Sequence, residues 1–225
     1  MAQFPDYSDL AADPARAGLT IGHALTMTLG LEWDEYRSYA DPLNSEIAME
    51  VAPDRYRFVL ERKVVEAPGS RWVYSGGATA LVGAIIERGT GRRIDDFARE
   101  VLFEPLGISH FEWLSGQDGV ASPASGLRLN ARDLLRIGRL VLDGGVAGDR
   151  RIVSKTWIET SLTPMATTDD GLAYGCFWFL GEAPALGAAR PWAAGFGNGG
   201  QRLWLMPEAD LACVIFSGNY NAPDA

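Results

Sequence analysis

The sequence has few cysteines and no long apolar run. Its two cysteines, Cys176 and Cys213, lie in apolar stretches typical of strands, so we expect buried thiols and neither a disulfide scaffold nor a metal site. No stretch approaches the ~18 continuous apolar residues of a membrane-spanning helix. The first ten residues show neither the basic nor the apolar region of an export signal. We therefore expect no membrane span, and the compartment stays open.

The chain also lacks a concentration of positive charge. Its 29 acidic residues outnumber 20 basic ones, for a net charge of -9, and the basic residues are scattered. Because nucleic-acid binding depends on a basic patch or stripe, we expect no nucleic-acid partner. With 47% hydrophobic and 22% charged residues, the composition is that of an ordinary globular protein.

Most common catalytic motifs are missing. There is no phosphate-binding GxxxxGK[ST] loop, no HExxH, no CxxC and no G-x-S-x-G elbow, because Val73 holds the first glycine position before Ser75. Nucleotide and zinc chemistry are disfavoured, and we expect no metal or other cofactor. A Ser-His-Asp triad would need His23 or His110, whose helical or turn contexts favour packing or capping roles.

The first two thirds of the chain predict helices. Thr20, Asn130 and Ser154 are suitable N-caps, and runs of apolar residues at helical spacing follow. Residues 1–18 contain prolines and aspartates without periodicity and predict a loop. The expected helices cover residues 20 to about 30, 54–65, 79–87, 94–102, 130–141 and 154–158.

After Pro164 the sequence changes to runs of aromatic and β-branched residues, which predict strands. A four-residue loop joins the last two, which should be antiparallel neighbours. Helices first and strands last, without βαβ alternation, indicate an α+β fold. The expected strands cover residues 174–180, 201–206 and 211–217, and the expected regions are a loop over 1–18, a helical lobe over 19–165 and an antiparallel sheet portion over 166–225.

Two glycine-rich segments stand out, WVYSGG at residues 72–77 and GFGNGGQ at residues 195–201. Glycine lets a backbone approach a ligand closely, although a turn or a bulge also explains each segment. With their surroundings, they resemble the second and third active-site motifs of the β-lactamase-related serine hydrolases. That group includes class C β-lactamases, penicillin-binding proteins, DD-peptidases, esterases and 6-aminohexanoate-oligomer hydrolases. The resemblance runs in order from Leu19 to about Asn221, through segments such as APGSRWVYSGGATALVGAIIE and ASGLRLNARDLLRIGRLVLDGG.

The resemblance implies a β-lactamase/transpeptidase-like fold and an acyl-enzyme mechanism. In that family a Ser-x-x-Lys helix supplies the nucleophile and its base, and a Tyr-x-Asn loop supplies a phenol. Tyr74 matches the phenol, which would take the proton of the serine and return it to the leaving group. Gly76 stands where the family often has the asparagine, so a side-chain amide that contacts substrate or lysine is missing.

The third motif of the family, a Lys-Thr-Gly-like strand, is matched by Asn198-Gly199-Gly200. The resemblance makes the N–H of Gln201 the oxyanion donor, or that of Gly200 after a one-residue shift. Because Asn198 replaces a cation, recognition of a substrate carboxylate loses a charge-assisted hydrogen bond of about 1.5 to 3 kcal/mol. We therefore expect an ester or amide without a carboxylate as the small-molecule substrate, and weak or no β-lactam turnover.

No serine or threonine of this sequence is followed by a lysine three residues later. Either the chain is a truncated piece of an active hydrolase, short at its N-terminus and at its C-terminus and inactive alone, or it is a non-catalytic binding or degenerate protein that keeps the cleft. A third hypothesis, with Ser75 as nucleophile, is disfavoured because no lysine or histidine is placed to deprotonate it. A truncated sheet would expose an edge, so we also expect self-association.

Overall fold

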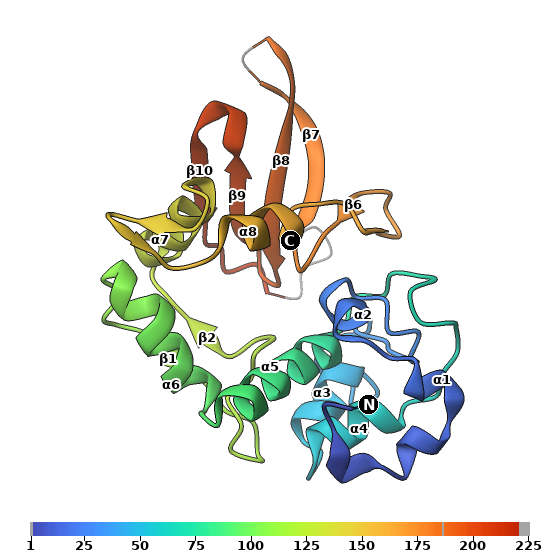
Figure 1. The fold of residues 1–225 in the computed structure, drawn as a ribbon. Helices are drawn as coiled ribbons and strands as arrows, with labels where there is room; N and C mark the ends of the chain where they lie inside the picture. Colours follow the sequence, from blue (N-terminus) through green and yellow to red (C-terminus); the bar gives the residue numbers. More distant parts are fainter. Residues whose placement is uncertain (1, 186, 221–225) are drawn as a thin grey trace. The chain divides into compact units, whose positions relative to one another are not determined.

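The computed structural model describes residues 2–185 and 187–220, shown in Figure 1. The contacts divide the chain into two compact units. Unit 1 is Met1–Ala98 with Glu112–Arg128, and unit 2 is Arg99–Phe111 with Leu129–Ala225. The α+β class is confirmed, with a six-stranded antiparallel sheet in unit 2. The boundary at residue 165, predicted between a helical lobe and a sheet portion, rests on the sequence, whereas the two units are defined by contacts. That boundary therefore remains a prediction.

The helices of unit 1 begin at side-chain caps. The Thr20 hydroxyl accepts from the His23 N–H, and Nδ1 of His23 accepts from the Thr20 N–H, so the capping role expected for His23 is confirmed. Asn44 caps a helix that the sequence analysis missed. The main helices are α2 (Ile21–Leu25), α3 (Ser45–Glu50), α4 (Arg55–Glu61), α5 (Gly76–Thr90) and α6 (Ile94–Ala98).

The first 18 residues differ from the expected loop. They form short helical turns, η1 (Pro5–Tyr7), η2 (Leu10–Ala12) and α1 (Pro14–Ala17). The Tyr7 hydroxyl donates to the Asp54 carboxylate at 2.9 Å, and the ring of Phe4 lies 6.3 Å from that of Tyr56. These contacts join residues about fifty positions apart, so local sequence patterns did not reveal them.

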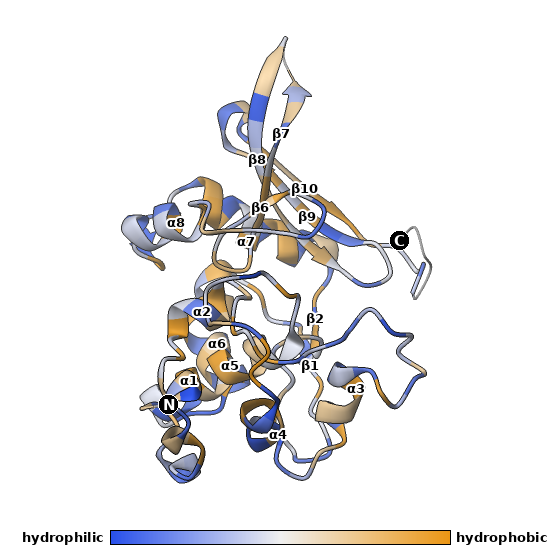
Figure 2. Cartoon of the chain, turned by 90° about the vertical axis from the view of Figure 1, so that its right-hand side faces the viewer, coloured by the Kyte–Doolittle hydropathy of each residue, from blue (hydrophilic) through white to orange (hydrophobic). Residues whose placement is uncertain are grey.

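Helix α5 is the buried centre of unit 1, and its apolar character is visible in Figure 2. Ser75 caps its start, and Gly91, with φ of 68°, ends it in the left-handed conformation that glycine adopts without strain. Gly77 lets the Trp33 ring pack on the first turn, because a Cβ there would lie 2.7 Å from the ring. The helix begins three residues earlier than expected, and its start places the WVYSGG segment.

A buried ion cluster explains why residues 112–128 belong to unit 1. The Arg55 side chain is 1% exposed and donates to Asp118 at 2.6 and 2.7 Å and to Glu50 at 3.3 Å. The Ser122 hydroxyl also donates to Glu50. A buried cation needs such partners because desolvation alone is costly. The same segment contains the small pair β1 (Glu112–Trp113) and β2 (Leu127–Arg128).

The sheet of unit 2 has the order β10-β9-β8-β7-β6-β5. The expected hairpin is confirmed, since Met206 pairs with Leu211 in antiparallel register. The single strand expected at 174–180 is interrupted, because Phe177 has a left-handed φ of 61°. The strands are β5 (Ala166–Thr167), β6 (Ala173–Tyr174), β7 (Phe179–Ala185), β8 (Ala188–Gly197), β9 (Gln201–Met206) and β10 (Leu211–Ile215).

One face of this sheet packs against helix α7 (Ala131–Leu142) and forms the core of unit 2 (Figure 1). Gly138 allows the helix to come close, because a Cβ there would lie 2.9 Å from Leu203. The buried centre consists of Leu180, Ala193, Leu203 and Leu205. The other elements of unit 2 are η3 (Arg99–Phe103), η4 (Glu104–Leu106), β3 (Val146–Ala147), β4 (Arg150–Arg151), α8 (Lys155–Ser161) and η5 (Pro207–Ala209).

The two cysteines are both free thiols, but only one is buried. Cys176 is buried and Cys213 is exposed, so the expectation of a buried thiol was wrong for Cys213. Cys213 pairs with Trp204 on the edge strand β10, whereas its neighbours Ala212 and Val214 pack on the core. Alternation along a strand therefore turns Cys213 away from the core.

Within residues 2–185 and 187–220, no helix is both long enough and apolar enough to span a bilayer. The sequence analysis expected the sheet portion to extend to residue 225 and the chain to be short at its C-terminus. Both expectations involve residues 221–225, which lie outside the described residues.

Candidate active site

The Tyr74 turn leads directly into helix α5. The Val73 N–H donates to the Met27 carbonyl at 2.8 Å, which fixes the approach of the chain. The Ser75 hydroxyl accepts from the Ala78 N–H at 3.1 Å and is the N-cap of α5. Ser75 is only 6% exposed. Its hydroxyl is therefore engaged in a cap, which argues against the hypothesis that Ser75 is the nucleophile.

A pair of carboxyl groups lies at this turn, and sequence analysis missed it. Oε1 of Glu35 accepts from the Gly76 N–H at 2.7 Å and from the Trp33 indole N–H at 2.9 Å. Glu46 is buried, and within the described residues neither of its carboxyl oxygens has a hydrogen-bond partner. The spacing of Glu35 and Glu46 along the sequence gives no signal that their carboxyls form a pair.

Burial and mutual repulsion change the acidity of both carboxyls. Burial, followed by the charge of Glu35, raises the pKa of Glu46 to about 9. Burial also raises the pKa of Glu35, although its hydrogen bonds oppose this rise. Two adjacent buried carboxyls cannot both ionise cheaply. At neutral pH the pair therefore retains a proton.

The same carboxyls occupy the space beside Gly76. A Cβ at this position would lie 1.8 Å from Oε2 of Glu46 and 2.8 Å from Oε1 of Glu35. An asparagine, as in the Tyr-x-Asn motif, would collide with them. The position of the carboxyl pair therefore requires a residue without a side chain at Gly76. The carboxyls place polar groups beside the turn, although the amide of the family motif is absent.

The surroundings of Tyr74 keep its phenol protonated. Burial raises the pKa of Tyr74, and the nearby acidic groups of Glu35, Tyr39 and Glu46 raise it further. Each of these groups disfavours the phenolate. A proton relay through Tyr74 would therefore need a cation beyond these neighbours.

The NGG turn in unit 2 joins β8 to β9. Gly199 and Gly200 have φ of 81° and 82°, a conformation strained for residues with a Cβ. The turn is held by the Asn219 N–H, which donates to the Gly199 carbonyl at 3.2 Å, and by the Gln201 side-chain amide, which donates to the Ser217 carbonyl. Asn198 is exposed.

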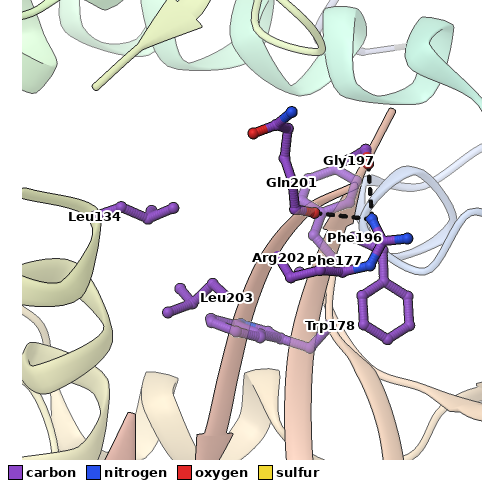
Figure 3. Close-up of a pocket in the computed structure, with 9 residues that line it drawn as sticks. Leu134, Phe177, Trp178, Phe196, Gly197, Gln201, Arg202 and Leu203 are labelled. Atoms are coloured by element: carbon purple, nitrogen blue, oxygen red, sulfur yellow. Dashed lines mark hydrogen bonds between the residues drawn. The ribbon is translucent and has the colours of Figure 1, made fainter. Parts of the chain in front are cut away.

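Arg202 places a positive charge next to this turn, which the sequence analysis did not anticipate. Its guanidinium donates to the carbonyls of Gly197 at 2.8 Å and Gln201 at 3.0 Å, as Figure 3 shows. It also lies 5.1 Å from the ring centroid of Phe196. The guanidinium therefore stabilises the strand ends beside the turn.

The structure collects the expected site residues in two groups. Tyr74 and Gly76 lie at the start of α5 in unit 1, whereas the NGG turn, with Asn198 and Gln201, lies in unit 2. That the two groups form one site stays a prediction. Among the residues described by the structure, no group of three or more histidine, cysteine or acidic side chains could hold a metal ion.

The Beta-lactamase family model matches residues 5–225, so the chain belongs to this family. The 6-aminohexanoate-dimer hydrolase of Paenarthrobacter ureafaciens is 31% identical over 177 residues, which are 73% of this chain and 43% of that protein. The monacolin J acid methylbutanoyltransferase of Aspergillus terreus is 28% identical over 150 residues, which are 64% of this chain and 34% of that protein. The chain thus spans less than half the length of these relatives.

Solved structures confirm the expected β-lactamase/transpeptidase-like fold. A family VIII carboxylesterase superposes with a TM-score of 0.72 at 15% identity, covering 97% of this chain and 70% of that one. The penicillin-binding protein of Bacillus halodurans superposes with a TM-score of 0.68 at 16% identity, covering 95% of this chain and 72% of that one. At these identities the likeness concerns the fold alone.

Proposed function

We propose that this chain is part of a serine hydrolase that cleaves an ester or amide through an acyl-enzyme. The observation that carries the proposal is the presence of both motif segments, in family order, in a chain that the Beta-lactamase family matches over residues 5–225. The relative named as a 6-aminohexanoate-dimer hydrolase supports hydrolysis as the reaction.

In this mechanism Tyr74 transfers protons and the NGG turn stabilises charge. The serine hydroxyl attacks the substrate carbonyl, its proton passes to the Tyr74 oxygen, and the phenol returns a proton to the leaving group. Because acidic neighbours raise the pKa of Tyr74, the lysine of a Ser-x-x-Lys motif would have to favour the phenolate. The N–H of Gln201 or Gly200 would stabilise the developing oxyanion.

The substrate class follows from Asn198, which is exposed beside the turn and carries no charge. A β-lactam carboxylate finds no charged partner at this position, so neutral esters or amides are favoured. In the polypeptide that contains the nucleophile, p-nitrophenyl butyrate should be hydrolysed faster than nitrocefin. Equal rates for the two substrates would contradict this part of the proposal.

We place the nucleophile in a segment outside these 225 residues, because Ser75 is committed to a helix cap. The 225-residue chain alone should then show no labelling by a fluorophosphonate probe, whereas labelling at Ser75 would overturn this assignment. The DNA upstream of Met1 provides a second test, since an in-frame Ser-x-x-Lys segment is expected there. Its absence would favour the alternative, a non-catalytic binding or degenerate protein that keeps the cleft.

The proposal also requires that Tyr74 and Asn198 meet across one cleft. Cysteines introduced at both positions, with Cys213 replaced by serine because it is exposed, should react with one short bifunctional maleimide within a single chain. A matched pair at Tyr74 and Glu182, on the strand β7, is the control. Equal crosslinking of both pairs would argue against a shared site.

A further inference from the structure

Unit 2 contains a hollow next to the NGG turn, with a volume of about 280 Å³. Figure 3 shows Leu134 projecting from α7 toward the strand that carries Leu203, with the Trp178 indole nearby. The remaining lining residues are Phe177, Gly195, Phe196, Gly197, Gln201 and Arg202. All of them belong to unit 2, so the hollow is defined within one compact unit.

The hollow exists because glycine takes the place of a side chain on β8. Gly195 pairs with Leu203, and paired residues of antiparallel strands project to the same face. That face is the one covered by α7, because Leu203 belongs to the core cluster there. A Cβ at Gly195 would meet no atom within 4 Å. The space above this residue is therefore empty although the face is otherwise packed.

Helix α7 contributes one wall of the hollow through Leu134. Gly138 brings the helix to within 2.9 Å of a Leu203 methyl, measured from the Cβ that the glycine lacks. Leu134, four residues earlier and hence on the same helix face, reaches over the space beside Gly195. The walls at this end are aliphatic and aromatic.

The polar groups lie at the other end, at the turn. Gln201 and Leu203 are two residues apart on β9, so they share a face at a separation of about 7 Å. A carbonyl held at the N–H of Gln201 would lie about 7 Å along β9 from Leu203, within reach of a short chain attached to its carbon. The volume is slightly below the range of about 300 to 1,000 Å³ of sites for drug-sized ligands, which suits a short linear chain.

We propose that the hollow over Gly195 binds the apolar acyl chain of the substrate, and that Gly195 and Leu134 set the chain length that is accepted. The inference rests on the proposed function, because the carbonyl is placed by the NGG turn. It adds the substrate class, namely esters or amides of short unbranched aliphatic acids.

The first test measures binding to the 225-residue chain and needs no catalysis. Titration with hexanamide, followed by NMR of methyl-labelled leucines, should shift the methyl signals of Leu134 and Leu203 saturably. Gly195→Val adds a side chain whose Cβ would meet no atom within 4 Å, and it should weaken binding about tenfold or more, as expected for lost methylene contacts. The control is Gly218→Val, whose Cβ would also meet no atom within 4 Å but which lies outside the hollow.

A reciprocal variant keeps the inference testable if Gly195→Val does not fold. Leu134→Ala enlarges the hollow and should shift preference toward longer amides, such as decanamide over hexanamide. Shifts confined to other leucines, or equal effects of Gly195→Val and Gly218→Val, would overturn the inference.

The second test separates this inference from the proposed function. In the polypeptide containing the nucleophile, Gly195→Val should lower kcat/KM for p-nitrophenyl hexanoate more than for the acetate. If binding follows the prediction but no ester is cleaved, the proposed hydrolysis fails and the pocket stands. Suppose instead that esters are cleaved, but Gly195→Val lowers kcat/KM equally for all acyl lengths or changes kcat/KM only between esters of different alcohols. The acyl pocket is then wrong and the proposed hydrolysis stands.

Discussion

The Glu35–Glu46 pair controls the electrostatics around Tyr74. Glu35 binds the first N–H of α5, and Glu46 fills the space that a side chain at Gly76 would need. Negative groups at a helix N-terminus are stabilised by the exposed N–H groups there. Two buried acids nonetheless repel each other unless they share a proton. The start of α5 is therefore sensitive to pH.

Glu46→Gln should stabilise the protein at alkaline pH. The pKa of Glu46 rises from 4.5 to about 9 on folding, so between these values the unfolded chain releases a proton that the folded protein keeps. Folding stability therefore falls as pH rises, by up to ~1.4 kcal/mol per pH unit. A glutamine keeps the size of the side chain but does not titrate. The melting temperature of the Glu46→Gln variant should match that of the original protein near pH 4 and exceed it near pH 8.

The control for this experiment is Glu112→Gln, because the Glu112 side chain is 59% exposed and pairs with Arg128 on the surface. It should show no comparable gain at alkaline pH. A melting-temperature difference between Glu46→Gln and the original protein that is the same at both pH values would contradict the shared proton.

Helices and strands meet closely where glycines replace side chains. The break between β6 and β7 places Gly175 against the end of α8, and the Cys176 N–H donates to the Ser161 carbonyl at 2.9 Å. A Cβ at Gly175 would lie 2.2 Å from the same carbonyl oxygen, which is backbone and cannot rotate away. This contact couples the position of α8 to the turn that holds Phe177 at the edge of the hollow.

Gly175→Ala should therefore destabilise the fold by about 1 to 3 kcal/mol, through a collision that forces a backbone shift. The matched variant Gly89→Ala lies on α5, where a new Cβ meets no atom within 4 Å. It should stabilise the protein by about 1 kcal/mol, because alanine favours a helix more than glycine does. Chemical denaturation measures both, and shifts of the same sign would contradict the close contact.

The chain as a whole presents an edge strand with apolar side chains. β10 ends the sheet order, and Leu211 and Ile215 on it are 52% and 49% exposed. They alternate with the core residues Ala212 and Val214, so they project away from α7. Among the described residues no strand pairs with the outer edge of β10, and an apolar edge strand is a template for pairing with a second chain.

We expect the 225-residue chain to self-associate through this edge. Sedimentation velocity should show a mass that grows with concentration, and Leu211→Lys with Ile215→Lys should return the chain to a monomer. Leu43→Lys, at an exposed position in unit 1, should leave association unchanged. A monomer at every concentration before any substitution would contradict the expectation.

Local chemistry was sufficient to predict the elements whose stabilising contacts are short-range. Thr20, Asn130 and Ser154 were identified as caps because each binds an N–H three residues away. The β9–β10 hairpin needed only a short loop between two strand-like runs. The family could be predicted as well, because its motif segments are contiguous.

Other features depended on residues that meet only in the folded chain. Strand β8 is rich in alanine and glycine, with weak strand propensity, and it forms because β7 and β9 pair with it on both sides. The Glu35–Glu46 pair and the hollow over Gly195 likewise arise where distant segments pack. The sequence by itself thus determined the caps, the hairpin and the family, because these depend on short-range contacts or on contiguous segments. The tertiary structure decided which groups surround Tyr74 and where a hollow lies beside the NGG turn, because burial and free space depend on the whole fold.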